Sequence, residues 1–333
     1  MQIPPPYKIN SEILDLISKI EANRIYFLSR ELSIQIKEKI QRVSILKSSL
    51  YSARIEGNPL TLEEIDISPS GEQQKIEILN ILKAVESIDK NIKAGQKISE
   101  KEILKLHAVV MADLFSRHGV LRQEMGAIFN AAGVAVYLSP PPKQIPLLLA
   151  KLFTYINSKD EKFPLVCALI AHLIFEKIHP FIDGNGRVGR LLILAILKAK
   201  NWHFEVNIPF EEYLDEHKND YYYYLDIGLK DTEEYLVFML NAFLKEIEKT
   251  KKLIEGETNK KETIFLPPRQ EEILNIVKDH SVISFDQIRR RFLKIPERTL
   301  RYDLKKLLDL KLIEKSGVTK GNYYRVKVNL LNS

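Results

Sequence analysis

The sequence predicts a mainly α-helical protein with a second, smaller module at its C-terminus. Apolar residues recur at three- and four-residue spacing from about Ser11 to Leu244, which is the period of helices buried along one face. The excess positive charge is confined to the end of the chain, where residues 261–333 hold 16 Lys and Arg against 9 Asp and Glu. The total of 333 residues is enough for two or three domains with cores of their own. The uneven charge indicates two modules with different partners.

The composition is that of a globular protein, with 45% hydrophobic and 28% charged residues. The longest apolar runs, such as residues 191–197, are too short to span a bilayer. The N-terminus has no basic flank followed by an apolar stretch, so no signal peptide is expected. The single cysteine, Cys167, excludes an intramolecular disulfide. We therefore expect a cytoplasmic protein with no membrane partner.

Four regions follow along the chain. Residues 1–100 form an N-terminal helical region and residues 101–245 a helical core, interrupted once by glycines, small residues and three prolines between Gly119 and Pro146. That interruption predicts a short β-hairpin followed by an extended proline turn. The hydrophilic stretch from residue 246 is either a helical end or a solvated linker, and we place a linker at 246–265. Residues 266–333 form the C-terminal module.

The twelve residues from His179 to Arg190 (HPFIDGNGRVGR) concentrate the chemistry of the chain. A long apolar segment runs into His179-Pro180, where proline must end the helix, and a second buried helix begins near Leu191. Between them, the two glycines beside Asn185 allow successive N–H groups to converge on an anion, at the positive end of the second helix.

Four side chains of this loop suit a polyphosphate with its metal. Asp183 is a hard oxygen ligand of the kind that Mg²⁺ prefers, and Arg187 and Arg190 can each bind phosphate oxygens in a fork. His179 can act as a base near neutral pH. Each residue alone has an ordinary structural explanation, such as a turn glycine or a histidine that ends a helix. Together they indicate a site for nucleotide and metal.

The stretch resembles the signature of the Fic family, His-x-Phe-x-(Asp/Glu)-Gly-Asn-Gly-Arg-x-x-Arg, at every defined position. The similarity covers roughly the first 245 residues and implies a helical Fic core that transfers AMP from ATP to a Ser, Thr or Tyr hydroxyl of a target protein, with release of pyrophosphate. It implies that His179 is the base, Asp183 the Mg²⁺ ligand and Phe181 a packing anchor. By the same resemblance, six further residues of the stretch would bind ATP: Gly184, Asn185, Gly186, Arg187, Gly189 and Arg190.

Two further features are assigned by the same resemblance. The hairpin from Gly119 to Pro142 looks like the family's flap, which docks an extended target segment by strand addition. Gly126 stands where related flaps often carry a valine, so the docking specificity cannot be transferred. Tyr221 and Tyr222 resemble an aromatic pair that flanks the nucleotide, and the alternative is ordinary helix packing.

An inhibitory pattern of the same family, (Ser/Thr)-x-x-x-Glu-(Gly/Asn), is matched by Ser52, Glu56 and Gly57. Ser52 and Glu56 are four residues apart and share a helical face, and Gly57 suits the end of that helix. The alternative is a surface glutamate on an amphipathic helix. The resemblance implies that Glu56 pairs with Arg190 and prevents it from binding the γ-phosphate.

The C-terminal module looks like a winged helix-turn-helix. Helical patterns at Arg269–Asp279, Ser284–Phe292 and Pro296–Leu310 are followed by a predicted hairpin at 312–325. The third helix is the candidate recognition helix, and its polar positions carry four candidate DNA contacts: Arg298, Arg301, Lys305 and Lys306. Many winged helices contact only proteins, so both duplex DNA and protein remain candidate partners of residues 266–333.

The sequence leaves three functions open. The first is a self-inhibited adenylyltransferase, and the second is a DNA-binding regulator whose Fic-like part senses nucleotide. The third is an enzyme that mainly removes AMP from its targets. The sequence does not identify the target, which could be the chain itself, and it leaves open whether the protein is a homodimer.

Overall fold

The chain divides into two structural units, Met1–Asn259 and Lys260–Ser333. The computed structural model describes residues 1–30, 32–64, 73–129, 135–259, 266–280, 282–310, 312–316 and 323–326. The regions 1–100 and 101–245 both belong to the first unit. Within the described ranges, no helix is both long and apolar enough to cross a membrane.

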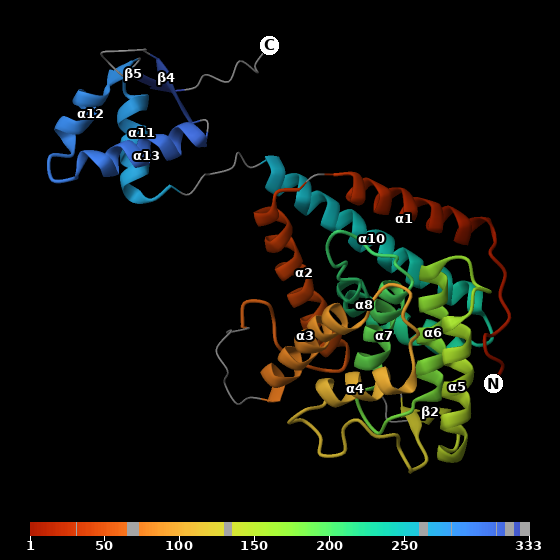
Figure 1. Cartoon of the computed structure of the whole chain (residues 1–333). Helices are drawn as coiled ribbons and strands as arrows, with labels where there is room; N and C mark the ends of the chain where they lie inside the picture. The colour runs from red at the N-terminus through yellow and green to blue at the C-terminus, as the bar shows by residue number, and fades with distance from the viewer. Residues whose placement is uncertain are drawn as a thin grey trace. The chain divides into compact units, whose positions relative to one another are not determined.

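The first unit is helical apart from one hairpin (Figure 1). Its helices are α1 (Ser11–Ser29), α2 (Ile34–Ile55), α3 (Gln73–Asn91), α4 (Glu100–Val110), α5 (Ile145–Asn157), α6 (Pro164–Ile178), α7 (Asn185–Ala199), α8 (Glu211–Glu216), α9 (Lys218–Ile227) and α10 (Thr232–Asn259). Strands β1 (Ala127–Phe129) and β2 (Ala135–Leu138) pair antiparallel, with Ala127 opposite Leu138, and a 3-10 turn follows at Pro142–Gln144. The predicted hairpin and proline turn are therefore present, although residues 130–134 lie outside the described ranges.

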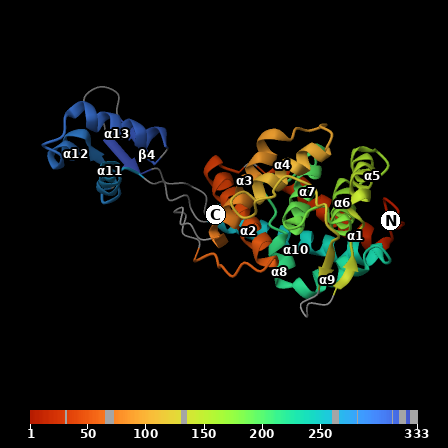
Figure 2. The same ribbon diagram turned by 90° about the horizontal axis from the view of Figure 1, so that it is seen from below.

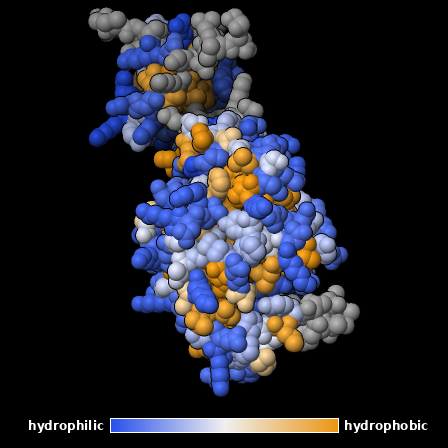
Figure 3. Space-filling view, turned by 90° about the vertical axis from the view of Figure 1, so that its right-hand side faces the viewer, coloured by the Kyte–Doolittle hydropathy of each residue, from blue (hydrophilic) through white to orange (hydrophobic). Residues whose placement is uncertain are grey.

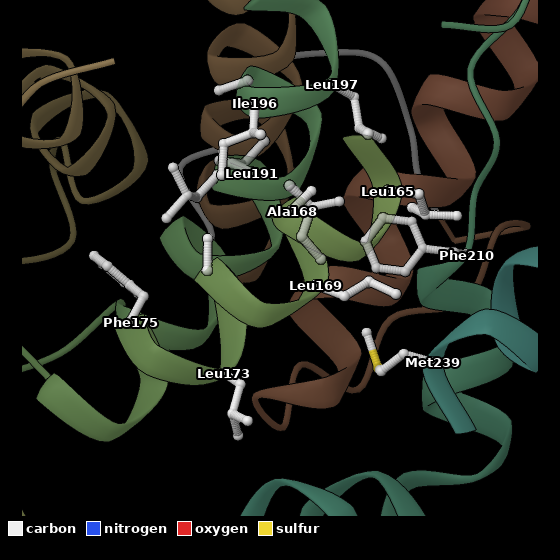
Figure 4. Packing of buried hydrophobic residues seen from close by; sticks show 14 of the residues in the cluster. Leu165, Ala168, Leu169, Leu173, Phe175, Leu191, Ile196, Leu197, Phe210 and Met239 are labelled. Atoms are coloured by element: carbon white, nitrogen blue, oxygen red, sulfur yellow. The ribbon is translucent and has the colours of Figure 1, made fainter. Parts of the chain in front are cut away.

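Helices α6 and α7 lie in the middle of this unit, with α3 and α4 on one side and α10 on the other (Figure 1, Figure 2). Every residue of α6 from Leu165 to Ile178 is buried, as expected for a helix that is apolar all round. Figure 4 shows Leu169 of α6 beside Phe210 and Met239. The loop therefore connects two deeply buried helices, α6 and α7, which restrict its movement.

Helix α10 corrects the predicted linker at 246–265. Residues 246–259 continue α10, and Ile247 and Ile254 are buried on the side that packs along α1. Tyr26 of α1 donates a hydrogen bond to Glu255 at 3.2 Å. Because the two isoleucines are seven residues apart, they lie on one stripe of the helix, and the charged residues between them face outward. The high charge of this stretch therefore marks a solvated helix face.

The second unit contains α11 (Pro268–Lys278), α12 (Phe285–Arg291), α13 (Glu297–Asp309) and the strands β3 (Ile283–Ser284), β4 (Ile313–Ser316) and β5 (Tyr323–Val326). The strands form an antiparallel sheet in the order β3-β5-β4. A separate apolar core includes Ile273, Ile288, Leu304 and Tyr324. The element order of three helices and a terminal strand pair is the one that the sequence predicts.

Hydrophilic residues predominate on the face shown in Figure 3, and its apolar residues form separate patches. Exposed apolar side chains of the first unit include Leu14, Ile25 and Leu28 of α1. Scattered exposure of this kind is usual for a folded protein.

Candidate active site

His179 stands at the exit of α6 in a left-handed conformation, with φ 51° and ψ 62°. Its amide still donates to Phe175 O at 2.9 Å, but Pro180 prevents a further helical turn. A non-glycine residue in this region is disfavoured by about 1–2 kcal/mol, so surrounding contacts must hold it. The predicted helix end at His179 is confirmed.

The imidazole of His179 is oriented by the helix that carries it. Nδ1 lies 3.3 Å from Glu176 O, and because a carbonyl oxygen can only accept, Nδ1 carries the proton. Nε2 is then the basic nitrogen. Burial lowers the pKa of His179 from its ordinary value, which keeps the ring neutral near pH 7. The ring is therefore in the form that can accept a proton.

Arg122 ties this helix exit to the flap. Its buried guanidinium donates to four backbone oxygens: Nε to His179 O (2.7 Å), Nη1 to Glu124 O (2.7 Å), and Nη2 to Pro140 O (2.7 Å) and Ile178 O (3.3 Å). The planar fork of an arginine suits several fixed carbonyls at once. Arg122 thereby links both ends of the flap to the backbone of His179.

A second histidine supports the loop from the side of α4. His107 stacks on Phe181, with ring centroids 3.7 Å apart, and its Nε2 lies 3.0 Å from Asp183 O. Its Nδ1 accepts from Gly119 N at 2.7 Å, so the proton is on Nε2. Burial lowers the pKa of His107 to about 4, and the ring is neutral. Phe181 is buried in this packing, as its expected role as an anchor requires.

The side chain of Asn185, which the sequence predicts to hold phosphate, bonds to the backbone of the loop. Its Oδ1 accepts from Phe181 N and its Nδ2 donates to Phe181 O, both at 2.9 Å, and the residue is buried. Both polar groups are thus used to close the loop on itself. Asn185 acts by fixing the conformation that presents the amides.

The first turn of α7 is suited to bind an anion. Gly184 precedes the helix with φ 80°, and no side chain caps the N–H groups that follow. The Glu56 carboxylate lies against this turn, because a Cβ added to Gly186 would stand 2.1 Å from Glu56 Oε1. A carboxylate at this position takes the place that a phosphate oxygen would occupy.

Glu56 and Arg190 form the ion pair that the inhibitory pattern predicts. Arg190 is 1% exposed, and its Nη2 donates to Glu56 Oε1 at 2.9 Å and to Ser52 O at 2.8 Å. Its Nε donates to Ser52 Oγ at 2.9 Å. Gly57 follows with φ 102° and ends the helix, which leaves Glu56 in the last turn. The spacing of Ser52 and Glu56 is explained because both contact the same guanidinium.

Arg187 forms ion pairs with two carboxylates. Its Nη1 donates to Glu77 Oε1 at 2.6 Å and its Nη2 to Asp183 Oδ1 at 2.8 Å. Asp183 also accepts from Gly184 N at 2.6 Å, and its side chain is 58% exposed. A single exposed carboxylate fits Mg²⁺ that takes its other oxygens from phosphates and water. No cluster of three or more His, Cys, Asp or Glu side chains suited to a metal exists among the described residues.

Gly189 and Tyr221, which the sequence predicts as nucleotide contacts, both pack near His172 of α6. A Cβ on Gly189 would stand 2.1 Å from Glu176 Oε1 and 3.0 Å from His172 Nδ1. Tyr221 is buried, with its hydroxyl 2.8 Å from His172 Nε2. Tyr222 is 43% exposed and donates to Ile55 O at 3.0 Å, next to Glu56. Of the two tyrosines, only Tyr222 is accessible.

Two buried carboxyl groups near Arg190, those of Glu176 and Glu211, are not among the predicted site residues. Burial raises the pKa of Glu176 to about 8 and that of Glu211 to about 7, while the charge of Arg190 opposes both shifts. Glu211 accepts a hydrogen bond from Ser48 at 2.6 Å. A lone acid within the apolar run 163–178 is the signal that could have identified Glu176.

The four candidate DNA contacts are exposed along α13 of the second unit. Arg301 forms an ion pair with Glu297 at 2.7 Å, and its guanidinium lies over the Phe285 ring at 4.1 Å. Lys306 lies 5.6 Å from the ring of Tyr302, which is itself exposed. The other two candidates, Arg298 and Lys305, complete a basic helix surface.

The region that holds the loop and its two helices is similar to one family of known proteins. Residues 97–197 match the model of the Fic/DOC family. "Protein adenylyltransferase Fic" of Drosophila yakuba is 28% identical over 188 residues, which cover 54% of this chain and 36% of that protein, and its Drosophila melanogaster counterpart is 27% identical over the same shares. The chain thus spans little more than a third of the length of these relatives.

Solved structures show the same fold. A Fic family protein from Desulfovibrio desulfuricans superposes with a TM-score of 0.69 at 23% identity, covering 97% of this chain and 98% of that one. Fic-1 of C. elegans gives a TM-score of 0.60 at 19% identity, with 74% and 73% covered. The region at residues 97–197, which carries the complete loop signature, is thus similar to the Fic/DOC family, and the first unit has the fold of these solved structures.

Proposed function

We propose that this protein is a self-inhibited protein adenylyltransferase that transfers AMP from ATP to a hydroxyl side chain of a target protein. The observation that carries the proposal is the Glu56 carboxylate, which lies against the first turn of α7 and pairs with Arg190. An anion of the protein itself thus occupies the anion site. The names of the Drosophila relatives support the same activity.

The triphosphate of ATP would bind where Glu56 now lies. The N–H groups of the first turn of α7 and the helix dipole favour negative charge there. Arg190 would exchange the Glu56 carboxylate for the γ-phosphate, and Arg187 would bind the neighbouring phosphate oxygens. Tyr222 of α9, whose hydroxyl donates to Ile55 O at the end of α2, would border the nucleotide.

The chemical step is displacement at the α-phosphorus. The target hydroxyl attacks as its proton moves to Nε2 of His179, the new O–P bond forms, and the bond from the α-phosphorus to the pyrophosphate oxygen breaks. The hydrogen bond from Nδ1 to Glu176 O keeps Nε2 aimed as the acceptor. Asp183 would hold Mg²⁺, which neutralises phosphate charge when bound.

The proposed inhibition is competition for Arg190. Two unit charges about 4 Å apart attract by roughly 4 kcal/mol at an effective dielectric constant of about 20, before the cost of desolvation is subtracted. A net advantage of even about 1.4 kcal/mol changes an equilibrium tenfold. Glu56 can therefore suppress productive ATP binding by a large factor.

The proposed partner is a protein segment that pairs with the flap. Strands β1 and β2 form a two-stranded sheet, and an extended target segment could add a strand to it. Through Arg122, the flap is joined to the backbone of His179. A docked hydroxyl would thus be positioned by the structure that orients the base.

For the second unit, we propose a winged helix that contacts duplex DNA. The basic residues exposed on α13 favour this reading, since phosphate contacts supply most of the affinity for DNA. The chain would then be a DNA-binding regulator whose first unit senses nucleotide, and the two functions are compatible. A protein partner for α13 is the alternative.

Mass spectrometry of the Glu56→Gly protein incubated with ATP and Mg²⁺, alone and with cell lysate, tests the activity. We expect a mass increase of one AMP on a Ser, Thr or Tyr of a target or of the chain itself, and none with Glu56→Gly/His179→Ala. Absence of AMP on every protein would contradict the proposal. Loss of AMP from a modified target on adding the wild-type protein would identify removal as the dominant direction.

A further inference from the structure

The side chain of Asn58 fastens the turn after Glu56 to α3. Asn58 is buried, and its Nδ2 donates to Glu77 Oε2 at 2.8 Å and to Gln74 O at 2.9 Å. Its Oδ1 accepts from Leu60 N at 3.1 Å, which fixes the amide orientation. The position of the inhibitory segment therefore depends on Glu77.

The same carboxylate holds the first arginine of the loop signature. Glu77 Oε1 accepts from Arg187 Nη1 at 2.6 Å, while Arg187 Nη2 donates to Asp183 Oδ1 at 2.8 Å. A continuous chain of hydrogen bonds thus runs from Asn58 through Glu77 and Arg187 to Asp183. It joins the end of α2, helix α3, helix α7 and the loop.

Burial makes this connection hard to replace by water. The side chains of Arg187 and Glu77 are 6% and 14% exposed, and Arg187 Nε is buried without a hydrogen-bond partner among the described residues. Removing one member of a buried ion pair leaves the other charge uncompensated. Arg187 is thus constrained to the arrangement that Glu77 sets.

We propose that Glu77 is a positioning residue that couples the inhibitory segment to the phosphate-binding loop. One oxygen of its carboxylate anchors the turn after Glu56 and the other orients Arg187, so movement of the turn and movement of Arg187 are linked. This proposal rests on the proposed adenylyltransferase activity and concerns its regulation. Glu77 contacts neither the nucleotide nor the attacking hydroxyl in this account.

The two contacts of Glu77 have opposite consequences for activity. Glu77→Gln has a single acceptor oxygen and cannot serve both Asn58 and Arg187. In the protein that retains Glu56, the loosened turn weakens inhibition, and AMP transfer rises about threefold to tenfold. In the Glu56→Gly background there is no inhibition to release, and the poorly oriented Arg187 raises the KM for ATP by a similar factor with little change in kcat.

Asn58→Ala separates the two contacts, because it removes the anchor of the turn and leaves the pair of Glu77 with Arg187 intact. We expect it to raise AMP transfer in the protein with Glu56 and to change nothing in the Glu56→Gly background. Glu86→Gln is the matched control, since Glu86 is an exposed carboxylate on the same helix. It should leave both backgrounds unchanged.

The experiment measures initial rates of AMP transfer from radiolabelled ATP in both backgrounds, with each of the three substitutions. Opposite effects of Glu77→Gln in the two backgrounds support the coupling. Loss of activity in both backgrounds, or an equal effect of Asn58→Ala in both, would overturn it. If the Glu77→Gln protein fails to fold, the proposal is tested by comparing the effect of Asn58→Ala in the protein with Glu56 and in the Glu56→Gly protein. An inactive Glu56→Gly parent would instead count against the proposed function.

Discussion

At the scale of single residues, the site depends on three buried arginines, each of which donates hydrogen bonds to other groups of the protein. Arg122 contacts backbone carbonyls, Arg187 two carboxylates, and Arg190 Glu56 together with Ser52. The loop signature identifies Arg187 and Arg190 from their spacing alone.

The signature does not reveal the contacts of these arginines. Glu77 is 110 residues from Arg187 in the sequence, and only the fold brings the two together. The same limit applies to the contacts of Gly189 and Tyr221. Their burial against His172 arises from packing between helices, which no local pattern records.

The first residue-scale prediction concerns Arg122. Arg122→Lys should lower AMP transfer by the Glu56→Gly protein about tenfold or more, because an ammonium cannot reach the separate carbonyls of His179 and Pro140 as the planar fork does. Arg117→Lys is the matched control, since Arg117 is exposed and pairs with the exposed Glu124. Equal rates for the two variants would show that the flap and the base are not coupled through Arg122.

The second residue-scale prediction concerns how the free energy of unfolding depends on pH. Burial raises the pKa of Glu176 to about 8, so between about 4.5 and 8 the folded state keeps a proton that the unfolded state releases. The free energy of unfolding should therefore fall as pH rises through this window, by at most about 1.4 kcal/mol per pH unit for this group. Glu176→Gln, which mimics the protonated acid, should remove this contribution.

Urea unfolding of both proteins from pH 5 to pH 9 measures the difference directly. The stability of Glu176→Gln relative to wild type should increase with pH and level off above about 8. Parallel curves would mean that Glu176 ionises in the folded protein as it does in the unfolded chain.

At the scale of elements, sequence patterns succeed where a local rule acts and fail where packing decides. Proline ends α6 at His179, and the run of glycine and proline places the hairpin. Charge density, in contrast, makes residues 246–259 resemble a linker. Their helical state depends on burial of Ile247 and Ile254 against α1, an element more than two hundred residues earlier in the chain.

The substitution Ile254→Ala tests whether the C-terminal end of α10 is packed against the rest of the first unit. Truncating a buried isoleucine should lower the free energy of unfolding by about 2–5 kcal/mol if the end of α10 is packed as described. Leu253→Ala is the neighbouring control, because Leu253 is 41% exposed and should cost far less. Similar unfolding midpoints for the two variants would mean that this stretch contributes no packing.

At the scale of the whole molecule, the charge asymmetry of the sequence corresponds to two separate units. The second unit holds the basic surplus and has its own apolar core. The sequence predicts its element order from periodicity, and a capping box of Ser284 and Gln287 begins α12 in the structure. It cannot choose between DNA and protein partners, because both use exposed basic helices.

DNA binding by the full-length chain is the prediction at this scale. A gel shift with duplex DNA at low salt should show binding that weakens steeply as salt rises, because bound phosphates release counterions. Replacing Arg298 and Lys305 by alanine should reduce both the affinity and the salt dependence. Unchanged binding by this variant would locate the contact elsewhere, and no binding at low salt would leave protein as the partner.

The central claim is that Arg190 is withheld from ATP by Glu56. The most direct measurement compares the initial rates of AMP transfer from radiolabelled ATP by wild-type and Glu56→Gly proteins at the same concentration. Loss of the ion pair and of the carboxylate at the first turn of α7 should raise the rate by at least tenfold, with the increase abolished by His179→Ala. Equal rates for wild type and Glu56→Gly would contradict the account.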